Sequence, residues 1–307
     1  MMSHSHNHHS HGKHSHHHGH NANRKALFIS FGLIFAFMVI EFIGGMMTNS
    51  LALLSDAGHM LSDAAALGLS LAALAFGGKE ANTSKTYGYK RFEILAAFIN
   101  GITLLAISIY IFWEAYHRFF SPPEVASAGM LGIAVVGLAV NIAAAWILMK
   151  GDMSGNLNLR SAFLHVLGDL LGSVGAIIAG LLMMIFNWNI ADPIASIIAA
   201  LLVLVSGFRV TKESVHILME GKPEHIDTDT LKKGILSIPS VKDIHDLHIW
   251  SITSDFPSLS CHVVVSEDGD RDRILQQVSE YLRKEFRLEH VTVQIEGEGH
   301  SHYHPCN

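Results

Sequence analysis

The stretch SLALLSDAGHMLSDAAALGLSLAALAF, residues 50–76, is long and apolar enough to cross a bilayer, yet it carries Asp56, His59 and Asp63. A membrane-spanning helix needs about 20 residues, and one charged side chain near the bilayer centre costs about 2.5–3.5 kcal/mol on insertion scales. At about 100° per residue, the three side chains share one face of a helix. Three ionisable groups on one face of an apolar helix indicate a function that needs them there.

A second apolar stretch, NLRSAFLHVLGDLLGSVGAIIAG, repeats part of this pattern, with His165 and Asp169 four residues apart. Two imidazole nitrogens and two carboxylate oxygens from these H-x-x-x-D pairs form a tetrahedral N₂O₂ set, which suits Zn²⁺ and also Cd²⁺ or Co²⁺. For one pair alone, an ordinary polar contact between helices is the alternative. Two pairs on separate apolar stretches favour one shared metal site. For Asp56, a role in supporting this site, a position on the exit route and a helix cap all stay open.

The composition is that of a membrane protein with a soluble portion. The 307 residues are 50% hydrophobic with a mean hydropathy of +0.32, and only 16% are charged, where soluble domains have about 25%. The two cysteines, Cys261 and Cys306, are too few for a disulfide framework and fit a reducing compartment. The sequence carries no DNA-binding module, so we expect no nucleic-acid partner.

Six apolar stretches predict a six-helix transmembrane domain over residues 24–211. They lie at 26–47, 52–76, 92–119, 128–149, 162–186 and 190–210. Short breaks such as MTNS and NWN predict antiparallel neighbours. Lys and Arg fall on one side of this arrangement with the exception of Arg118, so the positive-inside rule places both termini in the cytoplasm. We interpret Asn141 as a contact between helices and Asp192 as the N-cap of the sixth helix. For Glu41, a role in carrying protons and a structural role both stay open.

The flanking regions differ in composition. Residues 1–23 hold ten of the 22 histidines and are predicted to be disordered, with the capacity to collect metal ions with little discrimination. Residues 212–297 show amphipathic and alternating segments in the order αββαβ, which predicts a small α+β domain with helices on one face of a sheet. Residues 298–307 are predicted to form a flexible tail.

The sequence resembles the cation diffusion facilitator family, in its bacterial zinc and cadmium efflux branch. The resemblance rests on SLALLSDAGHMLSD, YGYKRFEILAAFING, NLRSAFLHVLGD, ADPIASI and ILMEGKP. It implies six transmembrane helices, a cytoplasmic ferredoxin-like (metallochaperone-like) α+β domain, and a homodimer that alternates access to its metal site. Position by position, it implies a transport site made of His59, Asp63, His165 and Asp169.

The resemblance also implies sites outside the membrane. Metal ligands of the cytoplasmic domain correspond to His245, His262 and Glu296, and Gln294 replaces a family histidine, which leaves a set to be completed by water or by the Cys306 tail of a second copy. His248 and His290 are interpreted as ordinary sheet or loop histidines. Arg91 and Glu220 would form a charge pair anchoring the two domains at the dimer axis, with two solvated surface charges as the alternative. A second family site is not expected, because its positions hold Asn82, Lys85 and Tyr89.

These observations predict a secondary transporter that exports Zn²⁺ from the cytoplasm, through a bacterial plasma membrane, in exchange for protons. Protons compete with metal for the same imidazole and carboxylate lone pairs, so the exchange needs no separate proton path. A metalloenzyme is not expected, because the chain lacks an H-E-x-x-H motif and four protein ligands would close the metal shell. The alternative is a membrane metal sensor with a dimerising cytoplasmic domain.

Overall fold

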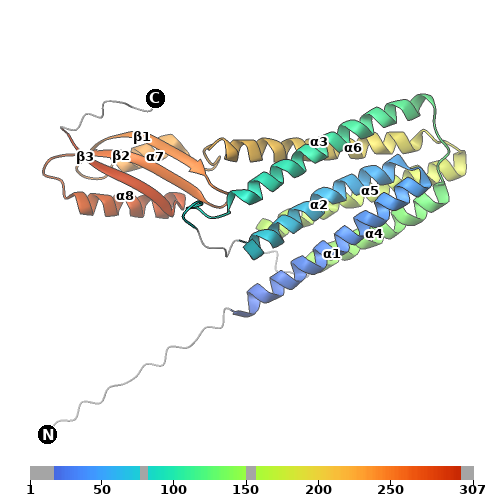
Figure 1. Cartoon of the computed structure of the whole chain (residues 1–307), viewed down its shortest axis with the longest axis horizontal. Coiled ribbons are helices and arrows are strands. Elements are labelled where there is room, and N and C mark those ends of the chain that lie inside the picture. The colour runs from blue at the N-terminus through green and yellow to red at the C-terminus, as the bar shows by residue number, and fades with distance from the viewer. Residues whose placement is uncertain (1–16, 77–81, 150–156, 299–307) are drawn as a thin grey trace, which may run out of the picture.

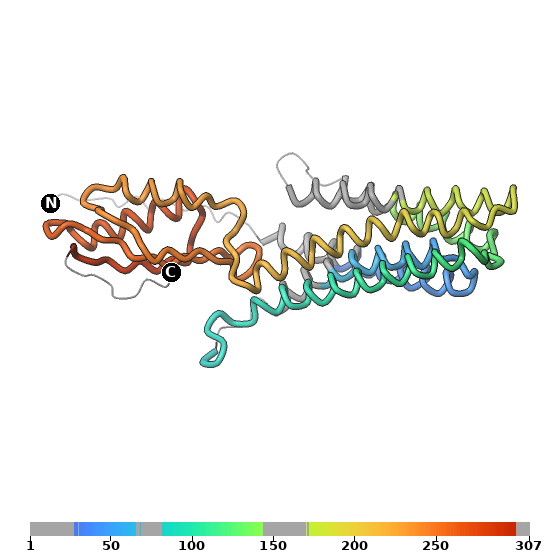
Figure 2. The backbone as a smooth tube through the Cα atoms, turned by 90° about the horizontal axis from the view of Figure 1, so that it is seen from above, coloured from blue at the N-terminus to red at the C-terminus, as the bar shows by residue number. Residues whose placement is uncertain are grey.

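The computed structural model describes residues 17–76, 82–149 and 157–298, and it describes side chains mainly within 31–65, 82–143 and 172–298. The molecule is elongated, with a bundle of helices at one end and a small α+β domain at the other (Figures 1 and 2). The predicted order of a helical membrane domain followed by an α+β domain is therefore confirmed.

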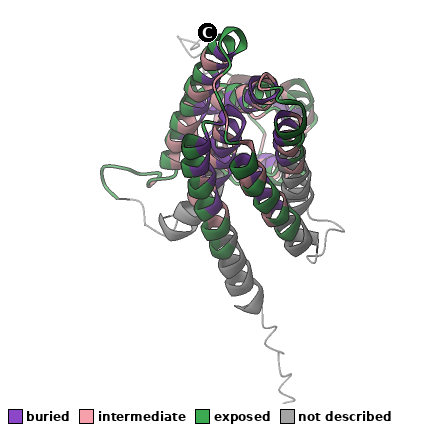
Figure 3. Ribbon diagram, turned by 90° about the vertical axis from the view of Figure 1, so that its right-hand side faces the viewer, coloured by how far each residue is buried: buried purple, intermediate pink, exposed green. Residues whose placement is uncertain are grey.

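The bundle consists of six helices, each overlapping a predicted apolar stretch. They are α1 (His17–Thr48), α2 (Leu51–Phe76), α3 (Arg91–Phe120), α4 (Ser127–Met149), α5 (Leu157–Phe186) and α6 (Ala191–Leu218). Within the described residues, three segments are long and apolar enough to cross a membrane: Phe31–Thr48, Arg91–Phe120 and Ala191–Leu218. Shorter apolar segments occur at Ser127–Ala143 and Gly172–Phe186. Buried residues face the interior of the bundle and exposed ones face outward (Figure 3).

Two helices extend further than the sequence predicts. Helix α1 begins at His17, inside the segment predicted to be disordered. The segment from His17 contains no proline, and an established helix gains one hydrogen bond for each residue it adds. Helix α6 continues to Leu218, beyond the predicted domain boundary at 211, with Ser214 and Ile217 buried on one side. It stops where Glu220 takes a left-handed backbone conformation, with φ of 60°.

The two tightest turns of the bundle each depend on an asparagine. Asn49, between α1 and α2, has φ of 56°, and Asn187, between α5 and α6, has φ of 51°. Asparagine tolerates this left-handed region better than most residues. The antiparallel neighbours predicted from the short breaks MTNS and NWN follow from these turns.

Asp192 caps the N-terminus of α2, whereas the sequence suggested that it caps its own helix, α6. Its carboxylate accepts hydrogen bonds from the Ser50 hydroxyl (2.7 Å) and from the backbone N–H groups of Leu51 (2.8 Å) and Ala52 (3.1 Å). The N-cap position of α6 is Ile190, which makes no side-chain cap. The prediction was wrong because an aspartate in a first turn can bond any adjacent orphan N–H group, and those of α2 lie against it.

The same carboxylate explains why Arg118 stands on the side that otherwise lacks cations. Arg118 Nη1 lies 3.7 Å from Asp192 Oδ2 and donates to the Asn49 carbonyl oxygen at 2.6 Å. Its Nε donates to Glu114 at 2.9 Å. Arg118 therefore joins α3 to the α1–α2 turn and to α6 at one end of the bundle, where its charge is compensated.

Helices α3 and α6 pack closely because glycines face each other across their contact. A Cβ atom added at Gly207 would lie 2.9 Å from Leu104 Cβ and 3.2 Å from the Gly101 carbonyl oxygen. Distances this short leave no room for a side chain. Helix α2 packs against α1, α3 and α6, and it also contacts α5.

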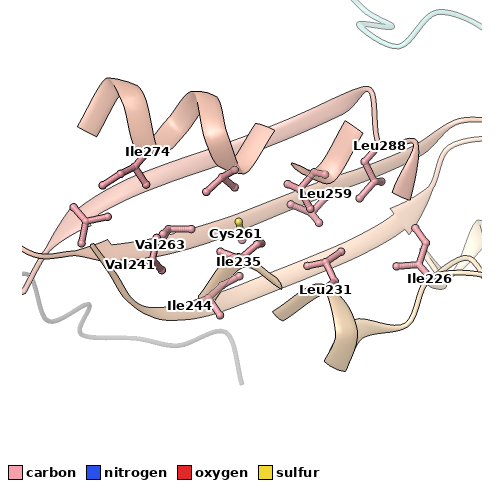
Figure 4. Packing of buried hydrophobic residues seen from close by; sticks show 13 residues of the cluster. Ile226, Leu231, Ile235, Val241, Ile244, Leu259, Cys261, Val263, Ile274 and Leu288 are labelled. Carbon is pink, nitrogen blue, oxygen red and sulfur yellow. The ribbon is translucent and has the colours of Figure 1, made fainter. Parts of the chain in front are cut away.

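The α+β domain has a three-stranded sheet covered on one face by two helices (Figure 4). Strand β1 (Val241–Ser251) pairs antiparallel with β2 (Pro257–Val265), which pairs parallel with β3 (His290–Gly297). Helices α7 (Thr228–Leu236) and α8 (Arg271–Phe286) complete the predicted order αββαβ, the last five elements of a ferredoxin-like β-α-β-β-α-β pattern. Their apolar faces bury Leu231, Ile235, Ile274, Val278 and Leu282 against the sheet.

We expect Asp192→Asn to lower the apparent melting temperature of the purified protein. The substitution weakens charge-assisted hydrogen bonds and leaves Arg118 without its buried anion, at a cost of about 1–3 kcal/mol. Thermal unfolding in detergent measures the effect, and Asp255→Asn, on an exposed loop residue, is the matched control. Equal melting temperatures for the two variants would contradict the capping role.

The Cys261 thiol is expected to resist modification in the folded protein. Burial in the core of the α+β domain raises its pKa to about 12, so at about pH 8 roughly one thiol in 10⁴ is ionised and able to react. A thiol reagent added to the Cys306→Ser variant should label Cys261 after denaturation and leave it unlabelled in the native state. Rapid labelling of the native protein would show that this core opens easily.

Candidate metal centres

Helix α2 buries the ionisable residues of the opening stretch inside the bundle. Asp56 and Asp63 are each 6% exposed, and His59 is half-buried. Asp56 lies against α5, where a Cβ atom added at Gly172 would be 3.0 Å from Asp56 Oδ1. The glycine thus leaves room for a carboxylate at the contact between α2 and α5.

His165 and Asp169, the predicted ligands on α5, have side chains outside the part of the chain that the structure describes. Their backbone is helical, as the H-x-x-x-D spacing requires. One turn further along α5, Ser173 is described and its hydroxyl accepts a hydrogen bond from Asn141 Nδ2 of α4 at 3.1 Å. The prediction that Asn141 joins two helices is confirmed.

Glu41 of α1 is a further buried carboxylate in the bundle and is 1% exposed. A Cβ atom added at Gly137 of α4 would lie 2.9 Å from Glu41 Oε1. Asn141 follows Gly137 by one helical turn on α4. The bundle therefore contains a buried polar layer through α1, α4, α5 and α2, which sequence periodicity alone did not reveal.

In the α+β domain, three predicted ligands from three strands come together on the face of the sheet opposite the helices. His245 of β1 is paired with His262 of β2, which is paired with Gln294 of β3. Side chains alternate between the faces of a strand, so Glu296 lies on the same face as Gln294. In the part of the chain that the structure describes, His245, His262 and Glu296 are the group of metal-ligating residues whose ligand atoms all lie within 4.8 Å of one another.

The buried carboxylate Glu296, 1% exposed, is the centre of this cluster. Its Oε1 lies 2.9 Å from His262 Nδ1, and its Oε2 lies 3.4 Å from His245 Nε2. Gln294 Nε2 donates a hydrogen bond to Glu296 Oε1 at 2.8 Å. Two imidazole nitrogens and a carboxylate form a ligand set typical of Zn²⁺.

Asp246 also faces this cluster, although the sequence did not indicate it. A β-bulge between His245 and His248 interrupts the pairing of β1 with β2, and Asp246 takes φ of 50°. Its Oδ2 lies 3.7 Å from His262 Nε2, and its Oδ1 lies 3.0 Å from His248 Nε2. Regular alternation would place Asp246 and His245 on opposite faces, and the position of a bulge is not readable from this sequence.

The two parts of the molecule are joined by contacts around the loop that precedes α3. Arg91 Nη2 lies 3.4 Å from Glu220 Oε1, so the two residues do form a charge pair, but it joins the start of α3 to the segment just after α6. In the same region, the Tyr87 hydroxyl lies 3.3 Å from His290 Nε2, and Lys90 Nζ lies 3.6 Å from the centre of the Phe256 ring. His290, interpreted from sequence as an ordinary histidine, is therefore an interdomain contact.

The loop positions where a further metal site was not expected interact with one another. Asn82 Oδ1 accepts hydrogen bonds from the backbone N–H groups of Ser84 and Lys85. Lys85 Nζ lies 4.5 Å from the centre of the Tyr89 ring. These contacts do not test the prediction. Cys306, suggested as a completing ligand, lies outside the described residues.

Comparison with protein families and known proteins gives matches along almost the whole chain. A model of the cation efflux transmembrane domain matches residues 27–219, and a model of the cytoplasmic domain of cation efflux proteins matches residues 223–298. A cadmium, cobalt and zinc/H⁺-K⁺ antiporter of Bacillus subtilis is 54% identical over 92% of this chain and 91% of that protein. The zinc transporter ZitB of Escherichia coli is 44% identical over 93% of this chain and 89% of that protein.

A solved structure also matches part of the chain. The metal-bound C-terminal domain of the CzcD transporter from Cupriavidus metallidurans is 39% identical, with a TM-score of 0.23, and the match covers 23% of this chain and 99% of that one.

Breaking the Arg91–Glu220 pair is expected to change stability by less than about 1 kcal/mol, because exposed ion pairs contribute little. The two side chains are 40% and 67% exposed. Arg91→Ala should therefore shift the melting temperature slightly, and high salt should remove the difference from the unmodified protein. A large loss of stability that persists in high salt would instead show that the pair supports the interdomain contact.

Proposed function

Because the chain belongs to the cation efflux, or cation diffusion facilitator, family, we propose that it is a secondary transporter that exports Zn²⁺ from the cytoplasm in exchange for protons. Cd²⁺ and Co²⁺ are further candidate substrates, since the Bacillus subtilis relative is named for all three metals. The observation that carries the proposal is the packing of α2 against α5, the two helices that each carry an H-x-x-x-D pair.

The contact between Asp56 and Gly172 sets the relative height of these two helices. They run in opposite directions along the bundle (Figure 1), so three residues forward on α2 correspond to three residues back on α5. At about 1.5 Å per residue, His59 and Asp169 are then at the same height. The other members of the two motifs, four residues further on each helix, are also level with each other. This register supports one shared site between α2 and α5.

Metal binding at the proposed N₂O₂ site offsets the free energy that is needed to place two carboxylates in a membrane. A dication held by two carboxylates and two neutral imidazoles cancels both negative charges, so loaded ligands are no longer unpaired charges in a medium of low dielectric constant. When the metal leaves, protons replace it on the same atoms. Export of Zn²⁺ is thereby coupled to the entry of protons at a single site.

A small pocket supports access to this site from the cytoplasmic side. It has a volume of about 260 Å³ and is lined by Ser62, next to Asp63, and by Glu93 and Glu213, among others. Both glutamates lie near the ends of α3 and α6 that adjoin the α+β domain. Negative charge at the mouth of a pocket raises the local concentration of cations.

We place the α+β domain and both termini in the cytoplasm, following the distribution of Lys and Arg, and we propose a bacterial plasma membrane as the location. The proposed active form is a homodimer. We further propose that His245, His262 and Glu296 bind a metal ion in the cytoplasmic domain and thereby report the cytoplasmic metal concentration.

The transport proposal is tested by Asp63→Asn in proteoliposomes with a pH gradient and a dye that reports Zn²⁺. Asparagine keeps the shape of the side chain but removes the negative charge that a dication requires, so we expect flux to fall at least 100-fold. Asp255→Asn, far from the bundle, should transport normally. Flux of Asp63→Asn at the level of this control would contradict the proposal, and flux that needs K⁺ and no pH gradient would contradict the choice of protons.

A further inference from the structure

We infer that Asp246 is a positioning residue for the cytoplasmic metal centre, holding the His262 ring so that its Nδ1 atom binds the metal. The inference rests on the proposed binding of metal by His245, His262 and Glu296, and it adds a residue that is not one of those ligands. Its effect would be to set the affinity of the centre.

The two nitrogens of the His262 ring face two different carboxylates. Nδ1 lies 2.9 Å from Glu296 Oε1, on the side where the three candidate ligands converge. Nε2, on the other side of the ring, lies 3.7 Å from Asp246 Oδ2. His262 is thus placed between the proposed metal position and Asp246.

The two nitrogens of a neutral imidazole have different roles, and this decides what Asp246 can do for His262. A neutral imidazole has one nitrogen with a lone pair and one that carries hydrogen. If Nδ1 binds the metal, Nε2 must carry the hydrogen, and Asp246 is the acceptor that faces it. Carboxylates that accept from the second nitrogen of a ligating histidine fix the tautomer and the ring orientation, and losing them typically costs 10–100-fold in metal affinity. At 3.7 Å the contact is longer than a hydrogen bond, so we expect it to shorten when metal binds.

The backbone holds Asp246 in this position. In a regular strand Asp246 would point to the face opposite His245, toward the apolar core under α7 and α8. The bulge between His245 and His248 lets Asp246 face the cluster instead, in a left-handed conformation with φ of 50° that aspartate accepts more readily than most residues. His248 Nε2, 3.0 Å from Asp246 Oδ1, steadies the carboxylate from its other side.

Glu296, like His262, is held by a neighbouring side chain that is not one of the three candidate ligands. Gln294 Nε2 donates to Glu296 Oε1 at 2.8 Å, so Gln294 orients a ligand. In this reading Gln294 supports Glu296 and Asp246 supports His262. Each supporting residue is a neighbour of a ligand on the open face of the sheet.

The test uses the full chain in nanodiscs, with His59→Ala and Asp63→Ala to remove the proposed transport site. Co²⁺ is titrated and followed by its visible absorption, and the component that Glu296→Ala abolishes defines the cytoplasmic centre. Asp246→Asn should weaken this component 10–100-fold and leave the spectrum at saturation unchanged, because the ligands stay the same. Asp246→Glu should recover part of the affinity. The matched control is Asp243→Asn, an exposed carboxylate on the same strand, which should bind Co²⁺ as the parent does.

The possible results separate the inference from its premise. If Glu296→Ala abolishes a component that Asp246→Asn leaves unchanged, the positioning role is wrong and the metal centre stands. A changed spectrum at saturation would make Asp246 a direct ligand, and a lower melting temperature of metal-free Asp246→Asn would make its role structural, so either result overturns the inference. If Glu296→Ala abolishes no component, the proposed cytoplasmic centre itself falls.

Discussion

The bundle depends on the carboxylate of Asp192, which is fully buried and holds the first turn of α2. A bilayer offers no water to satisfy the free N–H groups at a helix end, so a protein partner must satisfy them. By bonding the start of α2 from the first turn of α6, Asp192 fixes where α2 begins along the bundle. The heights of Asp56, His59 and Asp63 follow from that position, because a helix rises by a constant amount per residue.

The sequence was sufficient for features that depend on local pattern. The six bundle helices follow from runs of apolar residues, and the strands from alternation in segments such as LSCHVVVSE. It was not sufficient for features set by packing between distant segments. Asp192 sits 141 residues from Leu51, and no local rule identifies which helix end a first-turn aspartate will satisfy. The extension of α6 to Leu218 was not predicted, because the last turns of this helix are amphipathic and no longer apolar throughout.

The same distinction applies to the candidate sites: residues marked by local spacing or by family resemblance were predicted, and residues placed by the folded structure were not. Equal spacing of histidine and aspartate made the two membrane motifs visible in the sequence, and resemblance to a family located His245, His262 and Glu296. Asp246 was not found, since its orientation depends on a bulge that breaks the alternation of β1. His290 was likewise assigned no role, because its partner Tyr87 precedes it by 203 residues. The sheet thus uses its two faces differently, one for an apolar core and the other for polar chemistry.

The glycine contact between α3 and α6 has a mechanical consequence. A Cβ atom added at Gly101 or at Gly207 would lie 3.2 Å from the carbonyl oxygen of the other glycine, with Leu104 and Thr211 packed beside them. Because α3 and α6 are also in extensive contact, a displacement of one helix is passed on to the other. At one end of this helix pair, Lys90 contacts Phe256 of the α+β domain, and at the other end Asp192 of α6 holds the start of α2. A tilt of the α+β domain that moves α6 would therefore also move the start of α2, which Asp192 holds at the opposite end of the bundle.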